Sequence, residues 1–117
     1  MKAVIRVTAN FKKEAKPLLK KYKSLGNDLA ALEQQLLANP QLGTPLGSNA
    51  FKIRLKISSK GKGKSGGARV ITHLETDLIA NVELIDEEIT VNLISIYDKS
   101  ETEAISDKEL KRLIASI

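Results

Sequence analysis

The first forty residues change from a strand-like to a helical spacing of apolar side chains. Residues 3–9 (Ala-Val-Ile-Arg-Val-Thr-Ala) are β-branched or small, which is typical of a strand. Residues 11–25 follow the helical period, and lysines cover the rest of that helix. Thr8 or Asn10 is suited to cap it, and Pro17 is expected to kink it. The apolar stripe consists of Phe11, Ala15, Leu18, Leu19, Tyr22 and Leu25.

A second helix is expected after the link at residues 26–27 (Gly-Asn), ending at residues 39–40 (Asn-Pro). Because the link is short, the two helices should form an antiparallel hairpin. Residues 40–50 are rich in proline and glycine and predict a loop. The stripe of the second helix consists of Leu29, Leu32 and Leu36, with Leu37 at its edge.

Residues 51–57 alternate between two kinds of side chain. The apolar ones are expected to face the core of a sheet, and the cations between them to face outward. Residues 58–67 (Ser-Ser-Lys-Gly-Lys-Gly-Lys-Ser-Gly-Gly) follow as a loop. The core-facing set consists of Phe51, Ile53, Leu55 and Ile57.

Further strands and a last helix are predicted in the second half. The strands begin at about residue 68, at 82 and at 89, and an acidic turn over residues 86–88 should separate the last two. Ser106 and Glu109 form a capping box, and Ile105 and Leu110 form a hydrophobic staple. The inward face of this helix consists of Leu110, Leu113, Ile114 and Ile117.

This order of elements predicts a single α+β domain over residues 1–117, a length that suits one core. An antiparallel sheet is expected to pack against an N-terminal helical hairpin and a C-terminal helix.

The composition excludes several classes of protein. The chain has no cysteine and one histidine, so disulfides, thiolate chemistry and metal clusters built on cysteine or histidine are excluded. No apolar run is long enough to cross a bilayer, and the N-terminus lacks the apolar segment of a signal peptide. We therefore expect a cytoplasmic protein that binds no membrane and needs no metal or other cofactor.

The charges are divided unevenly along the chain. Residues 1–70 carry fifteen lysines and arginines against three acidic residues, whereas residues 71–117 carry four against eleven. Such a division predicts one surface for a polyanion, and nucleic acid is the obvious one. Four aromatic residues and no tryptophan are too few for a base-stacking platform, which argues against the usual single-strand binding folds.

The segment from Lys52 to Arg69 holds seven cations and no acidic residue. Glycines separate three of its lysines, and glycine lets backbone N–H groups approach a phosphate closely. We expect this segment to bind phosphates, with an affinity that falls steeply with salt. A solvated hairpin loop that keeps a sheet edge soluble is the alternative. The cations are Lys52, Arg54, Lys56, Lys60, Lys62, Lys64 and Arg69.

Three stretches resemble the RelE/ParE superfamily of bacterial toxins, most closely its HigB-like branch. They are Phe51-Lys-Ile-Arg-Leu-Lys-Ile, Gly61-Lys-Gly-Lys-Ser-Gly-Gly-Ala-Arg-Val-Ile and Leu93-Ile-Ser-Ile-Tyr-Asp-Lys-Ser-Glu. The resemblance covers nearly the whole chain and implies a microbial-RNase-like fold and a cognate antitoxin, expected to be a helix-turn-helix protein. For the RelE and HigB types it also implies cleavage of mRNA on the ribosome.

The resemblance assigns roles by position. The basic loop of the family falls on Lys60, Lys62 and Lys64, its phosphate-binding arginine on Arg69, and a basic residue after the last strand on Lys99. A C-terminal tyrosine of the RelE type would fall near Ile105, where this chain has none, and Tyr97 and His73 are the candidates to replace it. The stretch between Arg69 and Tyr97 is also about ten residues longer than expected.

The residues are compatible with ribonuclease chemistry. The reaction requires an activated 2′-hydroxyl, a stabilised phosphorane and a protonated 5′-oxygen. Clustered cations lower one another's pKa, so one lysine can act as base and another as acid. The leading hypothesis assigns catalysis to Lys62, Lys64, Arg69, Tyr97 and Lys99, and RNA binding to Lys52, Arg54, Lys56, Lys60 and His73.

Several alternatives remain open at this point. The chain could be a ParE-like inhibitor of DNA gyrase, or a non-catalytic relic that binds RNA or an antitoxin. His73 could be a surface or structural histidine, and Tyr97 could be core filler with its hydroxyl at the rim. The lysine-rich first helix could be a solvated face or a contact with ribosomal RNA.

Overall fold

The computed structural model describes residues 2–60, 67–80, 85–101 and 104–117, with side chains except at 60, 77–80 and 85–87. Within these ranges it is an α+β structure with a five-stranded mixed sheet and three α-helices, which confirms the predicted class. The elements are β1 (Lys2–Val7), α1 (Ala9–Lys21), α2 (Leu25–Ala38), β2 (Thr44–Gly47), β3 (Ala50–Leu55), the short 3-10 helix η1 (Ser58–Lys60), β4 (Ala68–Ala80), β5 (Ile85–Asp98) and α3 (Asp107–Ala115).

Thr8 caps α1, because its Oγ1 accepts the Phe11 N–H at 3.3 Å. Phe11, Ala15 and Leu18 are buried, as predicted. Leu19, however, is 44% exposed, so its assignment to the buried stripe was wrong. Neighbouring residues of a helix point about 100° apart, and the narrow contact of α1 with the sheet buries Leu18 rather than Leu19.

The sequence predicted that Gly26 and Asn27 form the link between the two helices. In the structure α2 begins at Leu25, so both residues belong to its first turn, and the prediction of the link is wrong. Leu25 is fully buried, and packing of this side chain outweighs the weak helix propensity of the two residues that follow. In the rest of the helix Leu32 and Leu36 are buried, while Leu37 at the edge of the stripe is 39% exposed.

The strand order is β1-β5-β4-β3-β2, and β1 runs parallel to β5. The prediction of an antiparallel sheet is therefore wrong for this pair and right for the other three. Parallel neighbours need a long connection, and here every element from α1 to β4 lies between the two strands. The alternation of side chains says nothing about the direction of a neighbouring strand.

Two predicted irregular segments are strands. β2 lies within the expected loop over 40–50, and Ser48 and Asn49, both with positive φ, turn the chain into β3. β2 is an edge strand, where the missing N–H of Pro45 is tolerated. The expected acidic turn at 86–88 is part of β5 and pairs with 77–79 of β4, because a ladder of backbone hydrogen bonds does not depend on side-chain charge.

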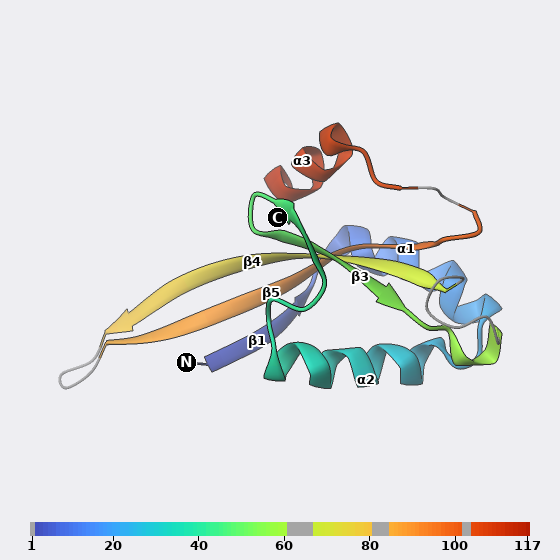
Figure 1. Cartoon of the computed structure of the whole chain (residues 1–117), viewed down its shortest axis with the longest axis horizontal. Helices are drawn as coiled ribbons and strands as arrows, with labels where there is room; N and C mark the ends of the chain where they lie inside the picture. Colours follow the sequence, from blue (N-terminus) through green and yellow to red (C-terminus); the bar gives the residue numbers. More distant parts are fainter. Residues whose placement is uncertain (1, 61–66, 81–84, 102–103) are drawn as a thin grey trace.

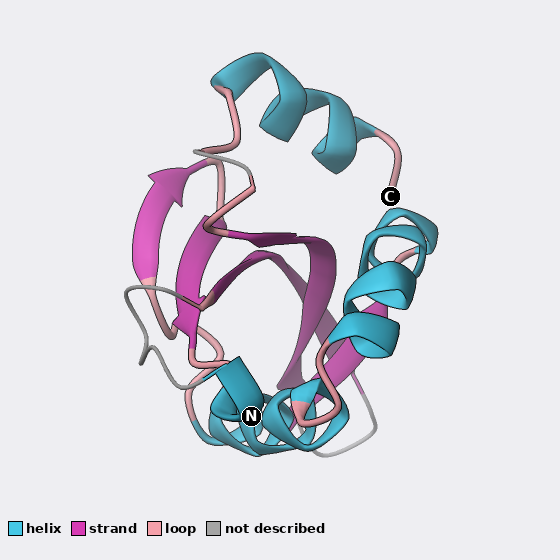
Figure 2. Ribbon diagram, turned by 90° about the vertical axis from the view of Figure 1, so that its right-hand side faces the viewer, coloured by secondary structure: helices cyan, strands magenta, loops and turns pink. Residues whose placement is uncertain are grey.

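The helices cover opposite faces of the sheet (Figure 1). α1 and α2 pack on one face over a core that includes Val70 and Ile96, and α3 packs on the other over Ile71 and Tyr97. Figure 2 shows the curved sheet between the two helical layers. The β4–β5 hairpin runs along the longest dimension of the molecule, 51 Å.

α3 follows its predicted signals. The Ser106 Oγ accepts the Glu109 N–H at 3.1 Å, which confirms the cap. The Glu109 carboxylate, however, bonds to Arg112, so the capping box is formed in one direction only. Ile105 and Leu110 pack in the same core cluster, which confirms the staple.

Where β1 ends, α1 covers the edge of β5. β1 pairs with β5 as far as Leu93, and beyond it the Asn10 side chain donates to the Ile94 carbonyl at 2.8 Å. The Glu14 carboxylate accepts the Ser95 hydroxyl at 2.7 Å and the Ile96 N–H at 3.4 Å. These contacts bind the edge of β5 that faces away from β4, where β1 no longer pairs with it.

Candidate nucleic-acid interface

Three side chains from neighbouring strands lie in one row across the sheet. Arg54 of β3 faces Arg69 of β4, and Arg69 faces Tyr97 of β5. Facing residues project from the same side of a sheet, with Cβ atoms about 5 Å apart. Tyr97 packs in the core beneath α3, so the row lies on that side. This Arg54–Arg69–Tyr97 row brings together three residues that the sequence predicted for the site.

Arg69 is a buried member of the row. Its residue is 5% exposed, and its Nη1 donates to the Ala68 carbonyl at 3.1 Å. Arg54 beside it is exposed. A guanidinium keeps its charge at any physiological pH, and its planar donors match two oxygens of a phosphate at once. Arg54 is therefore suited to bind a phosphate at the surface of the sheet, and Arg69 places a second positive charge next to it in the row.

Tyr97 ends the row with a buried hydroxyl. The residue is 8% exposed, and its hydroxyl has no hydrogen-bond partner among the described residues. Burial raises the pKa of this hydroxyl, while the nearby Ile105 N–H, outside hydrogen-bonding geometry, and the charge of Arg69 offset that rise only in part. Tyr97 therefore keeps its proton at neutral pH and can donate it.

A cavity of about 260 Å³ adjoins the Tyr97 end of the row, between α1, β5 and the start of α3. The residues that line it are Glu14, Ser95, Tyr97, Ala104, Ile105, Ser106 and Glu109.

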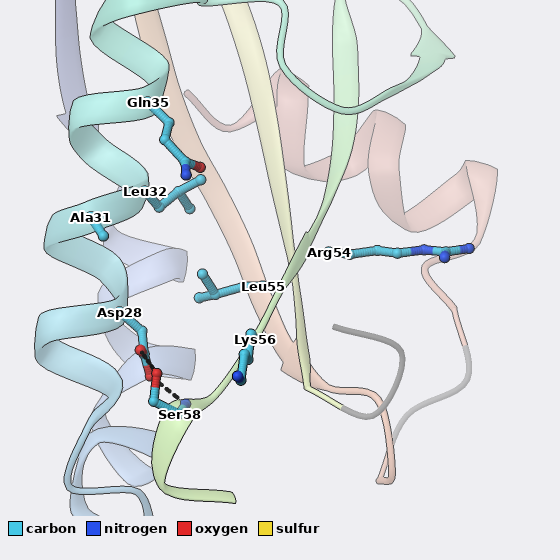
Figure 3. Close-up of a pocket in the computed structure, with 8 residues that line it drawn as sticks. All are labelled: Asp28, Ala31, Leu32, Gln35, Arg54, Leu55, Lys56 and Ser58. Atoms are coloured by element: carbon cyan, nitrogen blue, oxygen red, sulfur yellow. Dashed lines mark hydrogen bonds between the residues drawn. The ribbon is translucent and has the colours of Figure 1, made fainter. Parts of the chain in front are cut away.

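The β3 cations divide between two surroundings. Lys52 and Arg54 occupy alternate positions of the strand, and Arg54 points away from α2, whereas Leu55 points toward Leu32 of α2 (Figure 3). Lys56 follows the strand and lines a small pocket with Asp28 of α2. The structure thus brings Lys52 and Arg54 to the same side as Arg69. It places Lys56 near the carboxylate of Asp28.

Asp28 binds the start of η1, the 3-10 helix that follows β3, to α2. Its carboxylate accepts the Ser58 N–H at 3.0 Å and the Ser58 hydroxyl at 2.6 Å (Figure 3). It also accepts the Ser24 hydroxyl at 2.8 Å. Burial acts to raise the pKa of Asp28, but these hydrogen bonds and the charge of Lys56 outweigh it, so the pKa is lowered. The start of the basic loop is thereby tied to a helix.

Both ends of the basic loop lie beside the row. Leu55 pairs with Ala68, one position beyond the two arginines, and the loop joins these residues. Lys99 also lies here, because its backbone N–H donates to the Gly67 carbonyl at 3.0 Å. Of the three loop lysines, only the backbone of Lys60 lies within the described residues; the predicted site residues Lys62 and Lys64 lie outside them.

His73 shares the side of Arg69, as its position predicted, but not the row. It pairs with Ala50 and Asn92, four residues further along β4, which separates it from Arg69 by about 13 Å. Its Nδ1 is buried and has no partner in the described part of the chain. The geometry does not bring His73 to the phosphate that the arginines would hold.

Two carboxylates that support the row were missed from the sequence. Glu14 holds the edge of β5 at Ser95, and Asp98, 2% exposed, accepts the Tyr22 hydroxyl at 2.5 Å and the Ser100 hydroxyl at 2.7 Å. The only signal for Asp98 was its place directly after Tyr97. Glu14 carried none, because its partner strand is eighty residues away.

A scan of the chain against models of known protein families finds no match, and a search of solved structures finds none either. Within the described ranges, no helix is both long and apolar enough to span a bilayer. In those same ranges, no three histidine, cysteine or acidic side chains gather as metal ligands.

Proposed function

We propose that the chain is the toxin of a toxin–antitoxin pair, which cleaves mRNA on the ribosome and is neutralised by a cognate antitoxin. The observation that carries this proposal is the Arg54–Arg69–Tyr97 row, with two guanidinium groups beside a buried hydroxyl that retains its proton. A RelE-like fold of the HigB-like branch belongs to the proposal. The order of elements supports it: the first strand is followed by two helices and then by a meander of strands.

In the proposed reaction the 2′-oxygen attacks phosphorus and the bond to the 5′-oxygen breaks. The products are a 2′,3′-cyclic phosphate and a 5′-hydroxyl. Arg69 and Arg54 stabilise the charge that develops on the phosphorane oxygens. Tyr97 donates its proton to the departing 5′-oxygen, and a lysine of the basic loop accepts the proton of the 2′-hydroxyl.

The remaining cations position the RNA. Lys52, Lys56 and Lys99 are close enough to the row to contact neighbouring phosphates. The row has no histidine or carboxylate as a proton acceptor, so its catalysis would be weak on free RNA. An external surface that orients the substrate, such as the ribosome, would compensate for this weakness.

The test is induction of the chain in bacteria followed by mapping of mRNA 5′-ends. The wild-type chain should produce cuts in phase with codons. Tyr97→Phe removes the donated proton and should lower the cutting rate by about a hundredfold or more. Arg69→Lys removes the two-point contact and should have an effect of similar size.

One substitution outside the row serves as the control. Arg6→Lys changes an exposed arginine of β1 and should leave the cuts in place. Unbroken transcripts with stalled replication would indicate a gyrase inhibitor instead. A chain without any effect on growth or transcripts would be a non-catalytic relic, and full cutting by Tyr97→Phe would exclude Tyr97 from the site.

A further inference from the structure

A second surface, on the opposite face of the sheet from the row, combines an apolar groove with cations. The groove has a volume of about 300 Å³ and lies where the end of β1, α1 and α2 meet. Two of its apolar residues are well exposed, Val7 at 40% and Leu19 at 44%. The residues that line it are Val7, Phe11, Lys12, Ala15, Lys16, Leu19 and Leu29.

The floor and the rim of the groove follow the helical repeat of α1. Phe11, Ala15 and Leu19 are spaced by four residues and form an apolar ridge, with Lys12 and Lys16 in a parallel row beside it. Neither lysine forms an ion pair with any described residue, and among those residues no acidic one lines the groove. The groove therefore offers apolar contact along one line and positive charge along the next.

We propose that this groove binds an acidic amphipathic helix of a partner protein. Ridges spaced by four residues interlock with those of another helix, so a helix fits this surface better than an extended segment. Leucines at intervals of three and four residues would fill the groove, and carboxylates on one flank would pair with Lys12 and Lys16.

Charge distinguishes this occupant from a second copy of the chain, and shape distinguishes it from a membrane. In a symmetric contact a second copy of the chain would bring its Lys12 and Lys16 next to the same two lysines of the first copy, and the like charges would repel. An anionic membrane would match the charge, but the apolar surface is concave, and of its apolar residues only Val7 and Leu19 are well exposed. The proposal does not depend on the function assigned to the row.

The probe is a fluorescein-labelled helical peptide of about four turns, with leucines along one face and glutamates beside them. A second peptide has lysines in place of the glutamates. Anisotropy titrations with the full chain should show binding of the acidic peptide and none of the basic one. Leu19→Glu should weaken binding about tenfold or more, which is the loss of one well-packed apolar contact.

Leu37→Glu is the matched control, because Leu37 is 39% exposed on α2 and does not line the groove. It should change the affinity by less than about twofold. The double variant Lys12→Glu, Lys16→Glu should reverse the preference between the two peptides. Equal effects of Leu19→Glu and Leu37→Glu, equal binding of both peptides, or no binding of either would overturn the proposal.

Two further measurements cover the other occupants. Sedimentation of the wild-type chain should show a monomer, or a self-association that Leu19→Glu leaves unchanged. Co-sedimentation with vesicles of phosphatidylserine and phosphatidylcholine should show no binding that depends on Leu19. A positive result in either would assign the groove to a second copy or to a membrane surface, and so overturn the proposal.

Discussion

At Gly67 the backbone leaves no room for a side chain. A Cβ there would lie 2.1 Å from the Leu55 carbonyl oxygen, and the Gly67 carbonyl accepts the N–H of Lys99. Three chain segments meet at this point, directly beside the row. Glycine is needed at this position because the backbone of Leu55 approaches closely, and not because of a positive φ. Gly67 therefore has a structural role that the flexibility of a glycine-rich loop does not explain.

Gly67→Ala is expected to lower the free energy of unfolding by about 1–3 kcal/mol, because the methyl group forces β3 and β4 apart. Urea denaturation measures the change. Gly26→Ala is the matched control, since Gly26 lies in α2 with nothing near its Cβ position. It should leave stability unchanged or raise it by up to about 1 kcal/mol. Equal stability of Gly67→Ala and the wild-type chain would refute the close approach.

Single residues of the site could be predicted from the sequence to different degrees. Arg54, Arg69 and Tyr97 were all chosen from their residue types and from the family resemblance. Their alignment in one row follows from the register between three strands, which no residue encodes alone. His73 was placed on the correct face by alternation, but its distance from Arg69 depends on where each strand begins.

At the scale of elements, side chains distant in the sequence connect the strands and helices that support the site. Asp28 joins α2 to η1, Glu14 joins α1 to β5, and Ser106 starts α3 over the row. The cap of α3 was predicted because its donor and acceptor are three residues apart. The other two links were not, because each joins residues at least thirty positions apart.

Asp28→Ala is expected to lower stability at pH 7, because three hydrogen bonds to a carboxylate are lost. The folded-state pKa of Asp28 is below that of the unfolded chain, so its contribution is present above about pH 4 and disappears as the pH falls through the folded value. Urea midpoints of wild type and variant should differ at pH 7 and converge in acid. Glu33→Ala, an exposed acidic residue on the same helix, should show no such difference. A difference between the urea midpoints of wild type and Asp28→Ala that persists unchanged in acid would contradict the role of the Asp28 charge.

At the scale of the whole molecule, the sheet separates two surfaces. α3 and the row lie on one face, and α1, α2 and the apolar groove lie on the other. The excess of cations in residues 1–70 serves both faces, since β3 supplies Arg54 and α1 supplies Lys12 and Lys16. The charge division along the sequence therefore does not correspond to one binding face.

Binding of single-stranded RNA should weaken steeply with salt, with a slope of log K against log salt of about −0.7 for each phosphate contact. Arg54→Ala removes one contact and should make the slope shallower by about 0.7. Arg6→Ala, which removes an equal charge from β1, should leave the slope nearly unchanged. Identical slopes for the two variants would indicate a diffuse attraction and no defined phosphate site.

The sequence by itself determined the α+β class, the positions of the helices, the alternating face of β3 and the cation-rich segment. Each of these depends on contacts between near neighbours in the chain or on composition. Only the tertiary structure decided that β1 runs parallel to β5, that residues 86–88 continue a strand and that Leu19 faces outward. It also decided that Arg54, Arg69 and Tyr97 meet, because strand register arises from the packing of the whole sheet and a shift of one residue would turn each side chain to the opposite face.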